Sequence, residues 1–426
     1  MRSYWRWTFE VALVTGINRT QFAWACYDWA NSTFATTVLV GLFPVLFNSY
    51  YAAGVDPGLS TFYLAVFGNA AAAFVVMMLA PTLGVIADRR GLKKHFLAAF
   101  TGLGIAATCG LFLVGEGQWG LAIFLFSLAC VGFFGGLGFY DALLVSVANP
   151  SERDRVSAFG YGLGYLGGGL LFLFNVWMVL NPQVLGIPDK ATAVKIAFVS
   201  VGLWWLLFSL PLFLRVPEPQ TINAGSSMGW SELAATLKQM LGMKPVMTFL
   251  LAYWLYIDAV GTVAQMAVDF GIKLGFASDS LIKAILIVQF VSFPAALMFG
   301  WIGQRYGARR GIYLGLAVYF GLTCWAWFMQ SERDFYLMAA TVGLVQGGVQ
   351  SLSRSFFASL IPADASGQFF GFYNMLGKFA AVLGPLVVGF TAWLTGNPRL
   401  ALFTLIFFFV AGAILLSRVQ ESPVPE

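Results

Sequence analysis

Long apolar stretches alternate with short polar ones along almost the whole chain. The apolar stretches predict helices near 21–50, 61–87, 92–114, 119–148, 155–181, 191–214, 245–271, 279–304, 308–330, 333–360, 366–395 and 398–417. Crossing a bilayer takes about 20 apolar residues in a helix. Because a helix satisfies its own backbone hydrogen bonds in lipid, the pattern predicts an all-α membrane protein with twelve transmembrane helices.

One polar stretch divides the predicted helices into two sets of six. Residues 215–243 carry two prolines and a Gly-Ser run before an amphipathic piece, which is typical of a linker with a short surface helix. We therefore expect five parts in chain order: a cytoplasmic or interfacial N-terminal segment 1–20, an N-terminal six-helix bundle 21–214, the cytoplasmic linker 215–243, a C-terminal six-helix bundle 244–417 and a cytoplasmic tail 418–426.

The composition supports a membrane protein and argues against other classes. Hydrophobic residues make up 59% of the chain and charged residues 10%, whereas about a quarter of a soluble domain is charged. The single histidine and four scattered cysteines do not suggest a metal site. A phosphate-cradling Gly-rich loop that ends in Lys-Ser/Thr is also missing, which argues against ATP as the energy source. We expect no enzyme activity, no cofactor, no metal and no nucleic-acid partner.

The Lys and Arg residues lie mainly in the polar segments on one side of the predicted bundle, together with both termini. Positively charged loops stay in the cytoplasm. Both termini are therefore predicted to be cytoplasmic.

The two predicted halves share motifs in the same order. The matching pairs are Gly84–Gly91 with Lys93-Lys94 and Gly300–Gly307 with Arg309-Arg310, then Gly135-Gly136 and Gly347-Gly348, and finally Trp24-x-x-x-Asp28 and Trp254-x-x-x-Asp258. These matches predict a duplicated six-helix unit. Repeats of this parallel kind place a binding site between the halves, near the membrane midplane.

These motifs resemble those of a known family. The doubled G-x-x-x-D-R-x-G-x-K/R loop is similar to the signature of the major facilitator superfamily. Further motifs resemble the autophagy-related vacuolar amino-acid effluxer family and its bacterial relatives: Tyr27–Ser32, Glu152–Ser157, Gly160–Gly162, Gly164–Gly169, Gln350–Ser355, Phe369–Tyr373 and Gly377–Phe379. Gln304 departs from the pattern because it stands where the first copy has Asp88.

The resemblance implies the major facilitator fold, with two pseudo-symmetric six-helix bundles. It also implies a central cavity lined by the first, fourth, seventh and tenth helices. For a bacterial member, the expected location is the inner membrane.

Ionisable residues inside the predicted helices are the main candidates for function: Asp28, Asp141, Asp258, Arg354 and Lys378. Each costs about 2.5–3.5 kcal/mol at mid-bilayer on insertion scales, so we expect these side chains to face one another or a wet cavity. Three acids and two bases leave one carboxylate without a cation. Such a carboxylate is a natural place for a proton.

Each of these residues has a functional and a structural interpretation. Arg354 pairs with Asp141 or Asp28, either as a gate near the inner mouth or as a static ion pair. Asp258 or Asp28 either carries a coupling proton or is permanently satisfied by neighbours. Lys378 or Arg354 either holds a substrate carboxylate or serves as a counter-ion for the acids.

Polar and aromatic neighbours extend the candidate site. Asn31 and Ser32 share a helix face with Asp28. Tyr27, Trp29 and Trp254 supply either an aromatic wall or ordinary packing. Further polar candidates of the same kind are Gln265, Gln289, Gln346 and Asn374.

The loop after the second helix is the candidate gate. We expect Asp88, near a helix N-terminus or Arg89, to hold the outward-open state, with Gly84 and Gly91 allowing a tight turn. A solvated loop carboxylate is the alternative. Gly160, Gly164 and Gly168 recur every four residues, which predicts a close helix contact.

The leading functional prediction is a secondary active transporter that moves a small organic solute by alternating access, coupled to protons or another ion. The family resemblance points to an amino acid. The alternatives are a lipid or amphiphile flippase of the same fold and a membrane sensor that does not transport. The expected partners are the solute, the coupling ion and membrane lipids, and the expected state is a monomer.

Overall fold

The computed structural model describes residues 16–219, 238, 241–273 and 278–420, with the side chains of 264–279, 379–382 and 398 outside the description. Within these ranges the chain is helical and contains no strand. Most of the predicted N-terminal segment, the linker helix, the last six residues and the side chain of Gln265 lie outside the described part.

The first half of the chain, residues 19–215, forms long helices close to the predicted ranges. They are α2 (Arg19–Thr33) continued through π-helical Phe34–Leu42, α3 (Phe43–Leu46) and π-helical Phe47–Tyr51; α4 (Pro57–Tyr63) continued through π-helical Leu64–Ala70 into α5 (Ala71–Arg90); α6 (Lys93–Gly110); α7 (Trp119–Val147); α8 (Arg153–Leu180); and α9 (Lys190–Arg215). Short 3-10 turns follow α6 at Leu111–Leu113 and α8 at Pro182–Leu185.

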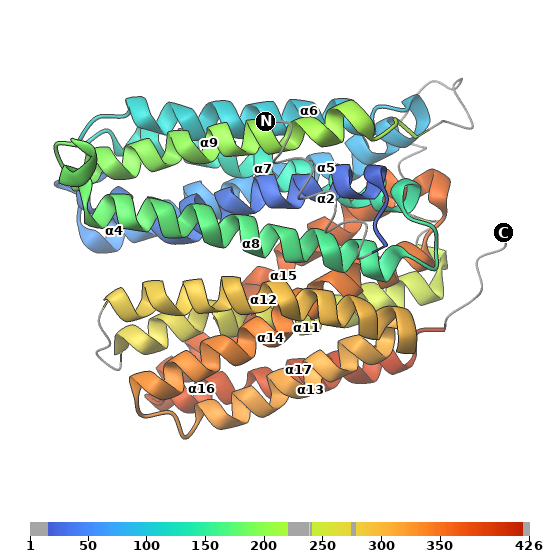
Figure 1. Ribbon diagram of the computed structural model, residues 1–426. Helices are drawn as coiled ribbons and strands as arrows, with labels where there is room; N and C mark the ends of the chain where they lie inside the picture. Colours follow the sequence, from blue (N-terminus) through green and yellow to red (C-terminus); the bar gives the residue numbers. More distant parts are fainter. Residues whose placement is uncertain (1–15, 220–237, 239–240, 274–277, 421–426) are drawn as a thin grey trace.

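The second half, residues 244–417, repeats this arrangement. Its helices are α11 (Lys244–Lys273), α12 (Ser278–Tyr306), α13 (Ala308–Ala326), α14 (Glu332–Leu360), α15 (Ser366–Thr395), α16 (Pro398–Phe403) and α17 (Leu405–Ser417), with a 3-10 turn at Ala363–Ala365. The two halves lie one above the other in Figure 1.

Local sequence explains where several helices begin and end. Asn18 caps α2 in a capping box with Gln21, so the helix starts at Arg19, two residues before the predicted start. Gly91 ends α5 with φ +62°, a left-handed conformation that glycine adopts without strain. Ser331 caps α14 in the same reciprocal way with Asp334.

Ten helical stretches of the described chain are long and apolar enough to cross a membrane. Two further long helices of the bundle, α13 and α14, are not among them. Their sequences carry Arg309 and Arg310 in α13, and Glu332, Arg333, Asp334 and Arg354 in α14. The count of twelve spanning helices stays a prediction.

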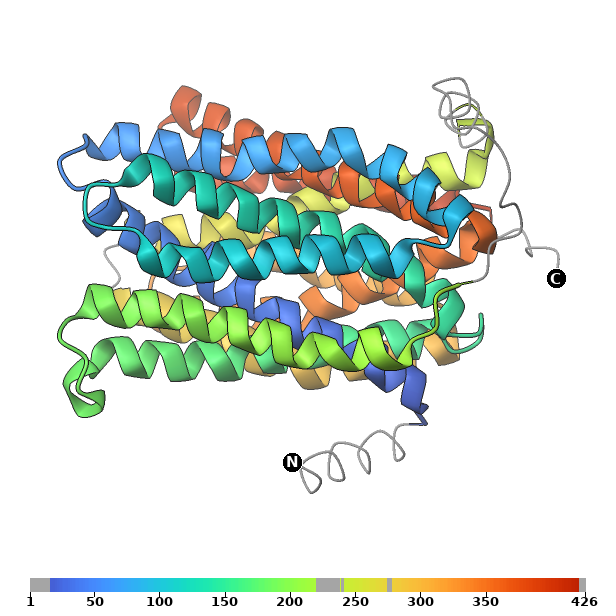
Figure 2. The same ribbon diagram turned by 90° about the horizontal axis from the view of Figure 1, so that it is seen from above.

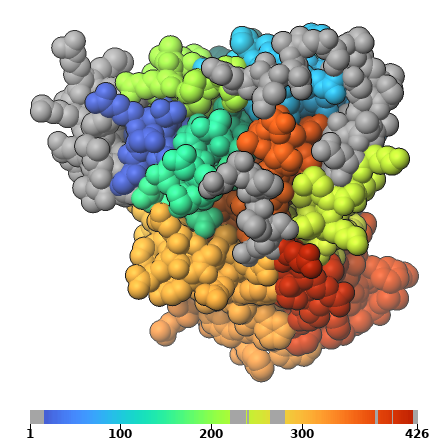
Figure 3. Space-filling model, turned by 90° about the vertical axis from the view of Figure 1, so that its right-hand side faces the viewer, coloured from blue at the N-terminus to red at the C-terminus, as the bar shows by residue number. Residues whose placement is uncertain are grey.

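The helices run along one common direction, so the loops gather at two ends of the bundle (Figures 1 and 2). One end carries Asp88 with the loops at Gly91, Pro150 and Gly307, and lies on the right in Figure 1. We call it the Asp88 end, and the other the opposite end. Figure 3 looks onto the Asp88 end, where first-half segments in teal lie against second-half segments in orange.

Two helix pairs join the halves in equivalent ways: α5 packs on α15, and α8 packs on α12. Glycines allow the close approach. A Cβ atom at Gly84 would lie 2.6 Å from the backbone oxygen of Gly367, and one at Gly300 would lie 2.6 Å from Cβ of Ala158. The first glycine of each loop motif therefore sits under a helix of the other half.

Glycine also sets the packing of α6 on α7, which generates a stability prediction. A Cβ at Gly132 would lie 2.4 Å from the backbone nitrogen of Gly104, whereas a Cβ at Gly120 on the same helix meets nothing within 4 Å. We expect Gly132→Ala to lower stability by about 1–3 kcal/mol through overpacking and Gly120→Ala to leave it nearly unchanged. Thermal unfolding in detergent measures both. Equal unfolding midpoints would contradict this account of the α6–α7 contact.

Candidate functional site

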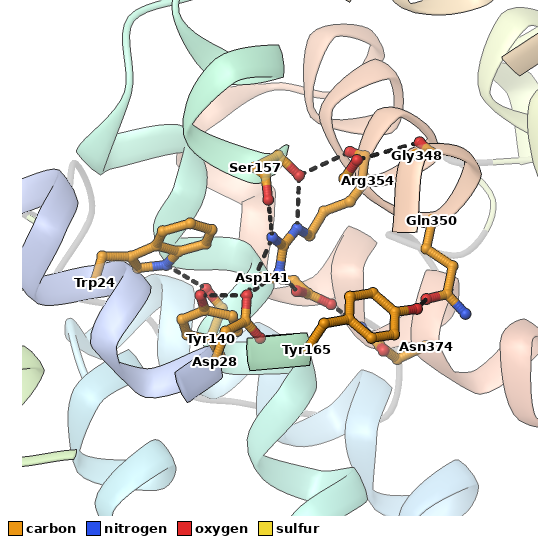
Figure 4. A network of polar contacts seen from close by, with 11 residues as sticks. Trp24, Asp28, Tyr140, Asp141, Ser157, Tyr165, Gly348, Gln350, Arg354 and Asn374 are labelled. Carbon is orange, nitrogen blue, oxygen red and sulfur yellow. Dashed lines mark hydrogen bonds and ion pairs between the residues drawn. The ribbon is translucent and has the colours of Figure 1, made fainter. Parts of the chain in front are cut away.

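The centre of the candidate site is a buried cluster around Arg354 of α14, near the Asp88 end (Figure 4). Its guanidinium group contacts two carboxylates of the first half: Nη1 lies 3.1 Å from Oδ1 of Asp141, and Nη2 lies 3.3 Å from Oδ2 of Asp28. Ser157 of α8 accepts from Nε through its hydroxyl at 2.9 Å and from Nη2 through its carbonyl at 2.8 Å. Arg354 therefore pairs with both acids at once, whereas the sequence predicted a pair with one or the other.

The hydrogen bonds of Arg354 use the full donor capacity of its guanidinium group. Nε makes one bond, while Nη1 and Nη2 make two each, to Asp28, Asp141 and Ser157. A guanidinium has five N–H donors, so none is left over. Because every donor is hydrogen-bonded, this charged side chain can be buried to 1% exposure without unsatisfied polar groups.

Aromatic rings surround the same cation. The guanidinium carbon lies 4.3 Å from the ring centre of Tyr161, 4.8 Å from that of Trp24 and 5.4 Å from that of Tyr140. Such distances allow cation–π attraction, which is stronger away from water. Tyr140 also donates its hydroxyl hydrogen to Asp28 at 2.8 Å.

The cluster joins the two halves of the molecule, because the cation comes from the second half and both acids come from the first. Asn374 of α15 adds another link by donating to Asp141 at 3.0 Å. Breaking a buried ion pair leaves uncompensated charge, which costs about 3–5 kcal/mol when one partner is removed. Separating the halves at this end therefore requires water to reach all three charges.

A second contact between the halves lies at the loop motif. Asp88, at the end of α5, accepts from the backbone N–H groups of Gly367 and Gln368 at 2.9 and 2.8 Å. These groups belong to the first turn of α15, where a helix favours negative charge. Lys93 lies 2.8 Å from the same carboxylate and donates to Ser366. Asp88 thus contacts a helix N-terminus, while Arg89 lies half-buried in the last turn of α5.

The corresponding contact of the second copy is weaker. Gln304 stands in the place of Asp88 and donates to the backbone oxygen of Ser151 at 3.4 Å. An amide has no charge, so it gains less from a helix terminus than a carboxylate does. The nearby acid at the second copy is Asp154 of α8, which accepts a hydrogen bond from the hydroxyl of Ser355.

A cavity of about 520 Å³ lies between the halves, on the side of the Arg354 cluster that faces the opposite end. The lining residues nearest the Asp88 end are Asp28 of α2, Asp141 of α7, Tyr161 of α8, Arg354 of α14 and Tyr373 of α15. Among the described residues, the terminal turns at the Asp88 end contribute none to the lining. The lining does reach Leu281 and Phe335, in the first turns of α12 and α14 at the opposite end. The cavity is therefore closed by the Arg354 cluster and extends toward the opposite end.

Lys378 lines this cavity from α15. Its Nζ lies 3.9 Å from the ring centre of Phe134, and among the described residues it forms no ion pair. Asn374, which is bonded to Asp141, is one helical turn away on the same face. The cavity thus holds a separate positive charge close to the Arg354 cluster, in which two acids share one cation.

Other predicted polar residues also line the cavity. They are Asn31, Ser32, Gln289, Gln346 and Asn374. The amide nitrogen of Asn31 is buried without a hydrogen-bond partner in the described structure. Gln289 of α12 donates to the hydroxyl of Thr36 at 2.7 Å, across a surface where Gly168 leaves room.

Four predicted site residues are not part of the cavity lining: Tyr27, Trp29, Trp254 and Asp258. The hydroxyl of Tyr27 is hydrogen-bonded to the hydroxyl of Thr101 of α6 at 2.8 Å, and Tyr27 packs in the core. Trp254 and Asp258 are on α11 but are not part of the lining, although Tyr253, Ile257 and Thr262 of the same helix are. The cavity face of α11 is thus one residue away from the face that the repeated motif suggested.

Three residues of these contacts are not among the candidates predicted from the sequence. Tyr140 and Ser157 supply hydrogen bonds to the Arg354 cluster, and Lys93 supplies positive charge beside Asp88. Ser157 and Lys93 lie inside motifs already singled out, Glu152–Ser157 and Gly84–Lys94. Their position in those motifs was the available signal.

The fold is similar to those of several solved transporters. The chain is similar to FucP, a major facilitator superfamily transporter, in the outward conformation, with a TM-score of 0.71, 12% identity and coverage of 95% of this chain and 100% of that one. The human organic anion transporter MFSD10 gives a TM-score of 0.68 at 16% identity, covering 93% and 99% of the two chains. The fold is that of a major facilitator superfamily transporter.

Sequence comparison narrows the class. Residues 51–152 and 145–423 match the family described as vacuole effluxer Atg22 like. The MFS-type transporter YxiO of Bacillus subtilis (strain 168) is 37% identical over 94% of both chains. Autophagy-related protein 22 of Eremothecium gossypii is 24% identical and covers 93% of this chain and 90% of its own. The chain belongs to the Atg22-like family of major facilitator transporters, and its relatives are transporters and not enzymes.

The Asp88 contact generates a prediction about the two halves. Asp88→Asn removes a charged acceptor and the ion pair with Lys93, and hydrogen bonds to charged groups contribute about 1.5–3 kcal/mol. We expect the separation of the halves at the Asp88 end to increase. Distances between spin labels at Arg215→Cys and Arg310→Cys, in a background without native cysteines, measure this separation.

The matched control for this experiment is Asp364→Asn. Asp364 is exposed in the turn just before α15 and has the same charge. The control should keep the parent distance distribution. An Asp88→Asn variant with the parent distribution would show that Asp88 does not hold the Asp88 end closed.

Proposed function

We propose that this protein is a secondary active transporter of a small zwitterionic solute, of which an amino acid is the best example. The observation that carries the proposal is the distribution of charge in the cavity. Asp28 and Asp141 share Arg354, which leaves that cluster with a formal charge of −1, while Lys378 supplies +1 nearby. A ligand with adjacent ammonium and carboxylate groups complements both charges.

The size and lining of the cavity support a small solute. Sites for small molecules commonly span about 300–1,000 Å³, and the volume here falls within that range. Besides the charged residues, the lining contains amides at Gln346 and Gln350 and apolar side chains such as Val288 and Phe335. The polar groups gather at the closed end, which favours a polar head group on the solute over a lipid chain as the part recognised there.

The relatives agree with a transporter but do not name its solute. Matches to the Atg22-like family support an effluxer, and a neighbour in the solved structures transports organic anions. Neither observation names the solute carried here. The zwitterion is inferred from the charges of the cavity.

Topology follows from the basic residues of the Asp88 end. Arg89, Arg90, Lys94, Arg305 and Arg310 lie in or beside its loops. By the positive-inside rule this end faces the cytoplasm. We propose twelve spanning helices with both termini in the cytoplasm, in a bacterial inner membrane, and a monomer as the working unit because one chain encloses the cavity. The cavity then faces outward.

The Arg354 cluster is also our candidate for proton coupling. Two carboxylates around one cation carry one surplus negative charge, and like charges in one buried site favour binding of a proton. Protonation weakens the hold of Asp28 or Asp141 on Arg354, so it would ease separation of the halves at this end. Proton binding and gating therefore involve the same contact.

The zwitterion hypothesis predicts a specific loss at Lys378. Lys378→Met keeps the length of the side chain but removes the charge that we assign to the carboxylate. We expect the affinity for amino acids to fall about tenfold or more, as loss of a charged hydrogen bond implies, while an amine without a carboxylate is affected less. Binding to purified protein measures both ligands.

The control for Lys378 is Lys283→Met on α12. Lys283 is exposed and does not line the cavity. Equal affinity of Lys378→Met and the parent protein for amino acids would refute the carboxylate role.

Proton coupling predicts a different signature. In Asp141→Asn the cluster has one acid and one cation and needs no proton for neutrality. We expect a pH gradient to stop stimulating flux into proteoliposomes, while exchange of labelled for unlabelled solute continues. Asp364→Asn should respond to the gradient as the parent does. Undiminished stimulation in both Asp141→Asn and Asp28→Asn would exclude this pair as the coupling site.

A further inference from the structure

A second polar site lies beside the cavity, on the face of α11 that packs on α15. Asp258 is 2% exposed there. Its Oδ2 accepts from the backbone N–H of Gly384 at 2.6 Å, and its Oδ1 is buried without a hydrogen-bond partner. Within the described part of the chain Asp258 has no ion pair. Its charge is therefore not balanced by the protein around it.

Thr262 supplies a second oxygen to the same place. It follows Asp258 by one helical turn on α11 and is 1% exposed, and its buried Oγ1 has no hydrogen-bond partner apart from the Asp258 carboxylate itself. A Cβ at Gly384 would lie 2.1 Å from this Oγ1 and 2.9 Å from Oδ1 of Asp258. The two oxygens thus converge on the backbone of Gly384, and only glycine leaves room for them.

The helix opposite contains a proline at this point. Pro385 lies inside α15 and has no N–H, so the carbonyl oxygen of Ala381 loses its helical donor. In membrane transporters, backbone carbonyl oxygens without a helical donor are places where cations are coordinated. The Asp258 site therefore offers a carboxylate and a hydroxyl, and the Ala381 carbonyl lies about one turn before Gly384 on α15.

We propose that Asp258, Thr262 and the α15 backbone near Gly384 bind a sodium ion. A water molecule would satisfy the hydrogen bonds but leave a bare carboxylate at membrane depth, which is unfavourable. A monovalent cation cancels its charge, whereas a divalent cation would leave an excess. Hard cations prefer oxygen ligands, and the close packing at Gly384 favours a small ion.

The site has a route to the substrate cavity and a link to its contents. Thr262 and Gly261 line the cavity, so an ion can reach Asp258 from there. Lys378 lies on α15 less than two turns before Gly384. Sodium would fix α15 against α11 and so set the position of Lys378. This last step rests on the proposed function, while the ion site itself does not.

The test measures sodium binding to the purified full-length protein without any solute. Thermal unfolding is followed at fixed pH while NaCl replaces choline chloride at constant ionic strength, with KCl as a second series. We expect a saturable rise of the unfolding midpoint with sodium only. Thr262→Val and Asp258→Asn should weaken the apparent sodium affinity about tenfold or more, because each removes a charged or polar ligand.

The matched control is Thr108→Val, since Thr108 is equally buried but bonds within α6, away from the cavity. It should bind sodium like the parent. If Asp258→Asn does not fold, Thr262→Val still decides the question.

Three outcomes would overturn the sodium site. They are equal responses to sodium and potassium, a sodium response unchanged in Thr262→Val, and a midpoint that follows pH but not sodium, which would place a proton on Asp258. Solute binding is measured separately. Intact solute binding without a sodium response refutes only this site, and a sodium response without solute binding refutes only the proposed function.

Discussion

The structure depends on one buried cation held between two acids of the other half. Arg354 has all its donors engaged, and its partners come from α2, α7 and α8. Buried ion pairs add little net stability, because desolvation offsets much of the attraction. A contact with little net stability suits a place where the two halves must separate and meet again. A cluster that is satisfied only when the halves meet favours closure at this end without locking it permanently.

The duplicated chain explains both the symmetry of the frame and the asymmetry of the site. Equivalent helix pairs, α5 with α15 and α8 with α12, place a loop-motif glycine under a helix of the other half. The charges are not duplicated in the same way. Asp88 has Gln304 as its counterpart, and Arg354 has no basic counterpart in the first half beside Asp141. The frame thus repeats, while the chemistry is concentrated where the two copies differ.

Sequence alone predicted the helix ranges and the grouping of Asp28, Asp141 and Arg354, because both follow from the cost of polar groups in lipid. It did not predict which face each residue occupies. Helices that are apolar all round give no clear amphipathic direction, so Tyr27 and Asp258 could not be distinguished from cavity residues such as Asn31. Hydrogen bonds to neutral partners, such as Ser157 with Arg354, depend on tertiary contact and leave no charge signal in the sequence.

The π-helical stretch Phe34–Leu42 has a consequence for the motion of α2 and the segment that continues it. A wider turn holds one surplus residue, and such turns occur mostly at functional positions. Passing that residue along the chain would rotate the part beyond it, with Thr36 and Val40, by about 100° relative to Asp28. The π-helical stretch is therefore a position where the outer part of this helix could turn about its axis while Arg19–Thr33 keeps its packing.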